Sequence, residues 1–270
     1  MNYIGIDIGS TAAKVVVRGE KEFAFTMPTG WSSKETALTI RENLKKDGIN
    51  MEEGQAKVVA TGYGRIAVDY ADYVITEITC HARGGRELGS DHCAVIDVGG
   101  QDTKVILIEN GMVQDFLMND KCSAGTGKFL EIMANRLGVT LQELFDMAAA
   151  GNTLSISSLC TVFAESEVIN YIGEGRKRED IAAGVVDSVA AKVAQLAMRK
   201  NLPDHIILTG GLSSSEYFTK ILSEKIGQKV CPTEQGRYAG ALGAALLAKE
   251  KTKTDKRDKN GTDQRIARGI

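Results

Sequence analysis

The sequence predicts an α/β fold built from two related halves, and two internal repeats carry this prediction. In the first repeat, an aspartate, a glycine and a lysine lie between two apolar runs, and the same three residue types recur 90 positions later. The matching pairs are Asp7 and Asp97, Gly9 and Gly99, and Lys14 and Lys104. In the second repeat, VVATGYG (58–64) resembles IILTGGL (206–212). Repeats in the same order indicate a duplicated unit. We call residues 7–14 the Asp7 loop and residues 97–104 the Asp97 loop.

The composition is that of an ordinary globular protein. The 270 residues are 43% hydrophobic and 25% charged, and the net charge of −2 gives no reason to expect a nucleic-acid partner. We find no apolar run of membrane-spanning length and expect no signal peptide, because residues 3–8 form a strand at once. Five cysteines without tight spacing do not predict a disulfide framework. We therefore expect a cytoplasmic protein with reduced thiols.

The elements of the first half follow in order. Strands are expected at residues 3–8, 15–18 and 57–60, with the Asp7 loop between the first two. Ser32 and Glu35 form a capping box for a helix that runs to Lys46. Residues 77–88 are expected to be helical and to lead into the second half. We place the first domain at residues 1–90.

The second half repeats this order with an insertion. Its strands are expected at residues 94–96, 105–108 and 206–208. Its helices are expected at 129–137, 141–150, 181–196, 216–227 and 240–247. The second domain is placed at residues 91–248. The lysine-rich stretch at 249–270 has no apolar period, so we expect a solvated, disordered tail or a frayed helix end.

The two Asp loops are candidate phosphate-binding loops. Glycines between strands let backbone N–H groups approach phosphate oxygens, and an aspartate can hold Mg²⁺ through water. Gln101 can orient an attacking water, and the lysines can offset phosphate charge. A single loop of this kind is equally well an ordinary glycine hairpin, but two matched copies favour function. The catalytic candidates are Asp7, Asp97 and Gln101. The nucleotide-binding candidates are Gly9, Ser10, Thr11, Lys14, Gly99, Gly100, Lys104, Gly125, Thr126, Gly127, Gly210 and Gly211.

Two cysteines, Cys122 and Cys160, each stand just ahead of a segment that is expected to be helical. A helix N-terminus favours thiolates and anionic metal–sulfur clusters. Two cysteines cannot complete a four-thiolate shell, whereas two copies of the chain can. The alternative is that both are small buried apolar residues, although the polar flanks of Cys122 argue against that. Cys80, Cys93 and Cys231 are expected to be structural, and His81 and His92 to be surface or packing residues.

The sequence then resembles known families. The two loops and Thr209-Gly210-Gly211 resemble the actin, Hsp70 and sugar-kinase superfamily. The runs NDKCSAGTGKFLE and SSLCTVFAESEVI resemble the ATP-dependent activators of 2-hydroxyacyl-CoA dehydratases, within the BadF/BadG/BcrA/BcrD ATPase family, over about residues 1–248. The resemblance implies duplicated actin-like (ribonuclease H-like) ATPase domains with a nucleotide cleft between them.

The resemblance also implies cofactors and partners. These are ATP or ADP, Mg²⁺, and a homodimer that holds one oxygen-sensitive [4Fe–4S] cluster on Cys122 and Cys160 of each chain. Ferredoxin or flavodoxin would supply a low-potential electron, which passes to a 2-hydroxyacyl-CoA dehydratase or a related benzoyl-CoA reductase in anaerobic metabolism. We expect the start of the helix after Cys122, with Ser123 and residues 125–127, to border both the cluster and the nucleotide.

Two other functions fit the same fold. A small-molecule kinase would need a substrate segment with a carboxylate base, and the insertion is taken up by the cysteine segment. A nucleotide-dependent scaffold would have no use for Cys122 and Cys160. Iron content separates the activator from both alternatives.

Overall fold

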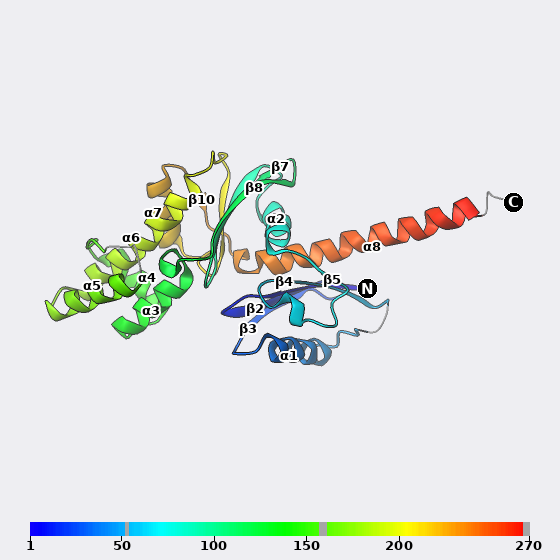
Figure 1. Cartoon of the computed structure of the whole chain (residues 1–270), viewed down its shortest axis with the longest axis horizontal. Coiled ribbons are helices and arrows are strands. Elements are labelled where there is room, and N and C mark those ends of the chain that lie inside the picture. The colour runs from blue at the N-terminus through cyan, green and yellow to red at the C-terminus, as the bar shows by residue number, and fades with distance from the viewer. Residues whose placement is uncertain (52–53, 157–160, 267–270) are drawn as a thin grey trace. The chain divides into compact units, whose positions relative to one another are not determined.

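The computed structural model describes residues 1–51, 54–156 and 161–266, and for residues 255–266 it describes the backbone. Contacts divide the chain into two compact units (Figure 1). The first contains Met1–Gly84 and Tyr238–Ile270, and the second contains Gly85–Arg237. No helix of the described residues is both long and apolar enough to cross a membrane.

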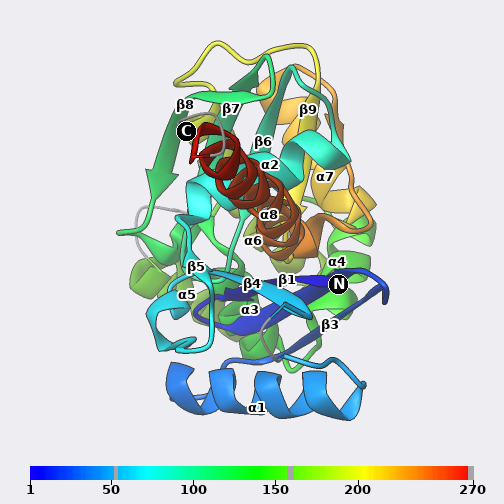
Figure 2. The same cartoon turned by 90° about the vertical axis from the view of Figure 1, so that its right-hand side faces the viewer.

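The first unit contains a five-stranded sheet in the order β3-β2-β1-β4-β5. Its strands are β1 (Asn2–Ile8), β2 (Ala12–Gly19), β3 (Phe23–Pro28), β4 (Ala56–Thr61) and β5 (Tyr73–Val74). Helix α1 (Ser33–Lys46) covers one face of this sheet, and α8 (Ala239–Ile266) covers the other (Figure 2). Helix α2 (Glu77–Leu88) follows β5.

Side chains of β1 alternate between the two covered faces. Ile4, Ile6 and Ile8 pack with the apolar side of α1 in one core cluster. Gly5 faces α8, where a Cβ atom would lie 1.8 Å from the carbonyl oxygen of Ala241. A glycine is therefore needed at this position for α8 to lie directly on the strand.

The second unit contains a sheet of the same topology, in the order β10-β9-β6-β7-β8. Its strands are β6 (Cys93–Val98), β7 (Thr103–Glu109), β8 (Met112–Asn119), β9 (Ile206–Gly210) and β10 (Val230–Cys231). Its helices are α3 (Gly127–Leu137), α4 (Leu141–Ala150), α5 (Thr161–Gly173), α6 (Arg178–Ala197) and α7 (Glu216–Ile226).

Strand registers confirm the predicted duplication. The central strands β1 and β6 each pair antiparallel with the next strand of the chain and parallel with a later one. The equivalent aspartates have equivalent neighbours, since Asp7 pairs with Lys14 and Thr61, and Asp97 pairs with Lys104 and Thr209. Both predicted repeats therefore converge on one aspartate in each unit.

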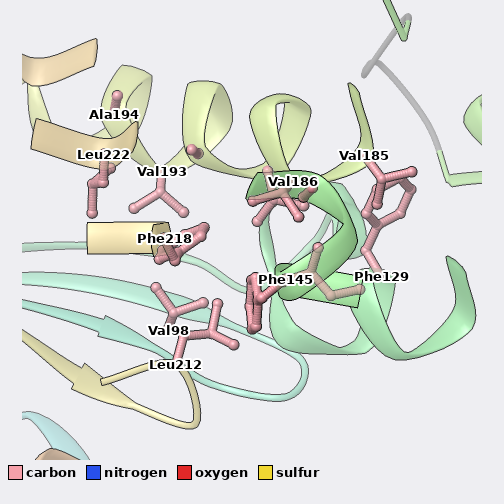
Figure 3. Packing of buried hydrophobic residues seen from close by; sticks show 14 of the residues in the cluster. Val98, Phe129, Phe145, Val185, Val186, Val193, Ala194, Leu212, Phe218 and Leu222 are labelled. Carbon is pink, nitrogen blue, oxygen red and sulfur yellow. The ribbon is translucent and has the colours of Figure 1, made fainter. Parts of the chain in front are cut away.

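The core of the second unit lies between its sheet and helices α3, α4, α6 and α7. Figure 3 shows Phe145 and Phe218 packed beneath α6, with Val98 and Leu212 on the side of the sheet. The two rings are tilted by 57° with centroids 6.4 Å apart, an arrangement that aromatic pairs prefer. This core fixes α6 on the sheet.

Helix boundaries agree with the capping signals. The Ser32 side chain accepts a hydrogen bond from the backbone N–H of Glu35 at the start of α1. Thr140 and Glu143 form a capping box at the start of α4, which runs from Leu141 to Ala150 as predicted.

The division of the chain differs from the predicted one near the C-terminus. Residues 238–248 belong to the first unit, because α8 packs on β1 and β4. The lysine-rich stretch after residue 248, which was predicted to be a disordered tail or a frayed helix end, continues α8 as a helix to Ile266. Strong helix formers such as Lys, Glu and Arg extend a helix that packing has already nucleated.

Candidate nucleotide loops and cysteine segment

The Asp7 loop is a tight connection between β1 and β2. Asp7 is buried, and the Lys14 Nζ lies 4.0 Å from its Oδ2. The backbone N–H of Gly9 donates to the carbonyl oxygen of Ala12 at 3.2 Å and closes the loop. Ser10 is partly exposed and Thr11 is exposed, so the tip of this loop is open to solvent.

The Asp97 loop carries a more tightly bonded cluster of charges. Lys104 and Asp97 side chains are each 3% exposed, with the lysine Nζ 3.6 Å from Asp97 Oδ2. Lys104 also donates to Asp102 at 2.7 Å, and Thr209 donates to Asp97 Oδ1 at 2.8 Å. One lysine thus serves two carboxylates, which leaves the cluster with an excess negative charge. Such a cluster suits a hard divalent cation better than a bare phosphate.

Asp102 and Thr209 side chains hold this cluster, and the sequence analysis assigned no role to either. A comparison of the two repeats could have identified Asp102 from the sequence. The matching position of the Asp7 loop is Ala12, so the acid appears only in the second copy. Gln101 lies exposed at the tip of the Asp97 loop, beyond Gly99 and Gly100. It has the accessibility that its predicted role requires.

Two glycines, Gly62 directly after β4 and Gly210 at the end of β9, lie very close to the central strands β1 and β6. Gly62 and Gly210 have φ values of +88° and +86°, which disfavour other residues. A Cβ atom at Gly62 would lie 2.4 Å from Asp7 Oδ1, and one at Gly210 would lie 2.3 Å from the carbonyl oxygen of Val98. By contrast, a Cβ atom at Gly211 would have no neighbour within 4 Å. Gly210 is therefore fixed by the fold, whereas Gly211 has open space beside it.

His81 has a buried position, which agrees with the packing role among its two expected roles. It is buried on α2, and its Nε2 lies 2.8 Å from the point that a Cβ atom would occupy at Gly240. Asp7 Oδ2 lies at the same distance from that point. Both side chains therefore point at Gly240. The distance between His81 Nε2 and Asp7 Oδ2 is at most twice 2.8 Å. His92 is exposed, as expected.

Cys122 lies three residues beyond the end of β8 and is partly exposed. It precedes a single turn of 3₁₀ helix at Ser123–Gly125, and α3 begins only at Gly127. This turn therefore separates Cys122 from α3, which begins two residues before its predicted start at residue 129. Asn119 Nδ2 donates to the carbonyl oxygen of Cys122 at 2.9 Å and fixes this position.

The first N–H groups of α3 are bonded to the Asp97 loop. Gly127 N donates to the carbonyl oxygen of Gly99 at 2.9 Å, and Lys128 N donates to that of Gly100 at 3.0 Å. These are two of the N–H groups that a helix start leaves without a partner inside the helix. Gly127 is thus joined to the candidate phosphate loop through its own backbone.

Cys160 lies outside the described residues, but its neighbour Thr161 begins α5. The Thr161 Oγ1 lies 2.7 Å from Ser123 Oγ, so the residues that follow the two cysteines are hydrogen-bonded to each other. Within the described residues, no group of three or more His, Cys, Asp and Glu side chains is placed to hold a metal ion.

The remaining cysteines are structural, as their surroundings indicate. Cys80 and Cys93 are buried, and burial raises the pKa of Cys80 to about 12 and that of Cys93 above its ordinary value. A thiol with a raised pKa is a poor nucleophile and a poor metal ligand at neutral pH. Cys231 is partly exposed on β10.

Helix α5 presents an unusually apolar outer face. Only Ala164 and Val168 are buried, whereas four large apolar side chains are each 46% exposed or more. They are Val162, Phe163, Ile169 and Ile172. Several large exposed apolar side chains on one helix are typical of a protein–protein contact.

Comparison with known proteins identifies the family. Residues 4–248 match the BadF/BadG/BcrA/BcrD ATPase family. The chain is 39% identical over 263 residues to the 2-hydroxyisocaproyl-CoA dehydratase activator of Clostridioides difficile, covering 96% of this chain and 98% of that protein. It is 41% identical over 253 residues to the (R)-2-hydroxyglutaryl-CoA dehydratase activating ATPase of Acidaminococcus fermentans, covering 92% and 97% of the two chains.

A solved structure extends the similarity to three dimensions. The activator of the 2-hydroxyisocaproyl-CoA dehydratase from Clostridium difficile, with bound ADPNP, superposes with a TM-score of 0.88 at 38% identity, over 96% of this chain and 98% of that one. The predicted family resemblance, fold class and ATPase activity are confirmed. The chain belongs to the BadF/BadG/BcrA/BcrD ATPase family.

Proposed function

We propose that this chain is an ATP-hydrolysing activator that passes a low-potential electron from ferredoxin or flavodoxin to a 2-hydroxyacyl-CoA dehydratase or a related acyl-CoA reductase. The observation that carries the proposal is the bonding of α3 to the Asp97 loop through Gly127 and Lys128. It joins a candidate phosphate loop to the segment that holds Cys122. The names of the similar proteins, which are dehydratase activators, support the same function.

In this proposal the two loops bind the nucleotide phosphates and Mg²⁺. The backbone of residues 9–11 and 99–100 approaches phosphate oxygens, and Asp7 and Asp97 hold the cation through water. Lys14 neutralises phosphate charge more readily than Lys104, because Lys104 already serves two carboxylates. Gln101 orients the attacking water, and Gly211 leaves space for the nucleoside.

The cysteines of two chains would hold one [4Fe–4S] cluster. Cys122 fits this role, because it is partly exposed and held by Asn119 through its carbonyl oxygen. The bond between Ser123 and Thr161 joins the residues that follow the two cysteines in the sequence. When bound, such a cluster stores and releases a single electron. The chain's own residues would orient the thiols and limit access of water to them.

The same arrangement requires a homodimer, and α5 offers a surface for it. Its exposed apolar side chains begin two residues after Cys160, so a two-fold contact along α5 would bring both cysteine pairs together. Burying this face would also remove the exposed apolar area from water. A dimer contact at α5 and a shared cluster therefore support each other.

The test is the iron and acid-labile sulfide content of protein purified without oxygen. We expect about four irons per dimer, and loss of the iron in both Cys122→Ala and Cys160→Ala. Cys231→Ala is the matched control and should keep the iron, because Cys231 lies on β10 away from the cysteine segment. Full iron content in Cys122→Ala would refute the ligand assignment. Iron-free wild-type protein would favour a kinase of the same fold.

A further inference from the structure

A side chain joins the Asp97 loop to the turn at residues 122–125, which we call the Cys122 turn, in addition to the backbone bonds that join the loop to the start of α3. Thr103 Oγ1 donates to the carbonyl oxygen of Gly125 at 2.6 Å. Thr103 is almost fully buried and stands directly between Asp102 and Lys104, which belong to the charged cluster beside Asp97. Its hydroxyl therefore connects that cluster to the far end of the Cys122 turn.

Adjacent strand ends hold the Cys122 turn at both of its ends. Thr103 at the start of β7 pairs in register with Asn119 at the end of β8. Asn119 bonds the carbonyl oxygen of Cys122, and Thr103 bonds that of Gly125. A backbone turn whose first and last carbonyl oxygens are bonded to the sheet moves with that sheet.

The duplication provides an internal comparison. The residue that matches Thr103 in the first half is Ala13, which is fully buried and has no hydroxyl. The strand itself therefore packs without a threonine at this position. The first half also has no counterpart of the Cys122 turn after its third strand, because only residues 29–32 separate β3 from α1 and they contain no 3₁₀ helix. Of the two matching positions, only Thr103 in the second half has a hydroxyl, and only the second half has the Cys122 turn.

We infer that Thr103 is a positioning residue that makes the Cys122 turn follow the nucleotide-dependent movement of the Asp97 loop. The inference rests on the proposed function for the role of Cys122 and of the loop. It goes further by assigning the connection to one side chain. Without this hydroxyl the loop can still bind nucleotide, but the buried Gly125 carbonyl loses its partner, and the direct bond between the loop and the turn is lost.

The test measures the reactivity of Cys122 in the full-length, cluster-free protein. Iodoacetamide labelling of each cysteine is followed by peptide mass spectrometry in ADP and in ADPNP, and the binding constants of both nucleotides are measured in parallel. We expect the Cys122 labelling rate of the wild type to differ between the nucleotides by about two- to tenfold, the range that one net hydrogen bond accounts for. Buried Cys80 and Cys93 serve as slow internal references.

Three variants isolate the hydroxyl. Thr103→Val should remove the difference between the nucleotides while both bind with unchanged affinity, and Thr103→Ser should restore it. Thr26→Val is the matched control, because Thr26 also donates to a backbone carbonyl, that of Ala13, at 3.1 Å in the first unit. It should keep the wild-type difference. A Thr103→Val protein with the wild-type difference overturns the inference, and so does a wild type that binds both nucleotides without any difference.

A measurement on the wild type covers the case in which Thr103→Val does not fold. Amide hydrogen exchange should change on nucleotide exchange in residues 122–128 together with residues 99–104. A change confined to the loop overturns the inference. Failure of the proposed function looks different, because it is seen as absence of iron in anaerobic wild-type protein whatever the labelling result.

Discussion

At the scale of single residues, the aspartates of the two repeats have different surroundings. Asp97 accepts a hydrogen bond from Thr209 and lies beside a buried lysine. Asp7 lies beside a more exposed lysine, whose side chain is 22% exposed, and Gly240 lies against the same carboxylate oxygen, Oδ2. The duplicated pattern thus fixes the positions of the acids, and the neighbours outside the pattern differentiate them.

Gly240→Ala should impair ATP hydrolysis. The added Cβ atom would lie 2.8 Å from both Asp7 Oδ2 and His81 Nε2, so the carboxylate must shift. Overpacking of about 1–3 kcal/mol corresponds to a loss of roughly five- to 150-fold in rate. Gly173→Ala is the control, since a Cβ atom there meets nothing within 4 Å. Steady-state ATPase rates check this, and equal rates for the two variants would contradict the crowding of Asp7.

The Cys80 thiol should make the protein less stable at alkaline pH. Burial raises its pKa in the folded state from 9.0 to about 12. Below pH 9 the thiol is neutral in both states and does not affect the pH dependence. Between these values only the unfolded state ionises, so the free energy of unfolding falls by about 1.4 kcal/mol per pH unit from this group.

Urea denaturation between pH 8 and 11 measures this dependence. Cys80→Ala should lose stability less steeply with rising pH than the wild type does. Cys231→Ala, which changes a partly exposed thiol, should follow the wild-type slope. Parallel curves for Cys80→Ala and the wild type would show that the thiol ionises without opening the core.

At the scale of elements, the pairing of β9 with β6 places Thr209 beside Asp97, and the pairing of β4 with β1 places Thr61 beside Asp7. Only Thr209 bonds its aspartate. The Thr61 hydroxyl is buried and has no hydrogen-bond partner among the described residues. The equivalent strands β9 and β4 therefore differ, because the Thr209 hydroxyl has a hydrogen-bond partner and the Thr61 hydroxyl has none among the described residues.

Valine substitutions should have opposite effects at these two positions. Thr209→Val removes a hydrogen bond to a buried carboxylate and should lower the free energy of unfolding by about 1.5–3 kcal/mol. Thr61→Val removes an unsatisfied buried hydroxyl and should leave stability unchanged or raise it by up to about 1 kcal/mol. Chemical denaturation of the nucleotide-free proteins compares them. Equal losses would mean that Thr61 bonds its aspartate in solution.

Repeats and caps predicted most elements, and the failures have physical reasons. Strand β8 was missed because it is an edge strand with large exposed side chains such as Phe116, so its apolar pattern does not reflect burial. Strand β3, the opposite case, was missed although its partly buried side chains alternate with exposed ones, the pattern that is typical of a strand. Backbone bonds such as Gly127 to Gly99 leave no pattern in side-chain types. The connection of the loop to the Cys122 turn was therefore visible only in the structure.

At the scale of the whole molecule, the apolar face of α5 predicts self-association. Ile169→Glu should place a charge in the proposed contact and weaken the dimer by at least about 100-fold, because an unpaired charge is costly to bury. Sedimentation velocity at several concentrations measures this. Ile66→Glu changes a more exposed isoleucine in the first unit, 76% against 50% for Ile169, and should remain dimeric. A dimeric Ile169→Glu protein would exclude α5 as the contact.

The order of the units along the chain has a consequence for synthesis. The first unit begins at Met1 but needs α8, since Gly5 of its central strand packs directly against Ala241. The second unit, Gly85–Arg237, is continuous and contains its own sheet and core. On the ribosome, the unit that starts later is therefore complete first. One face of the nascent β1 therefore stays uncovered until α8 has emerged from the ribosome.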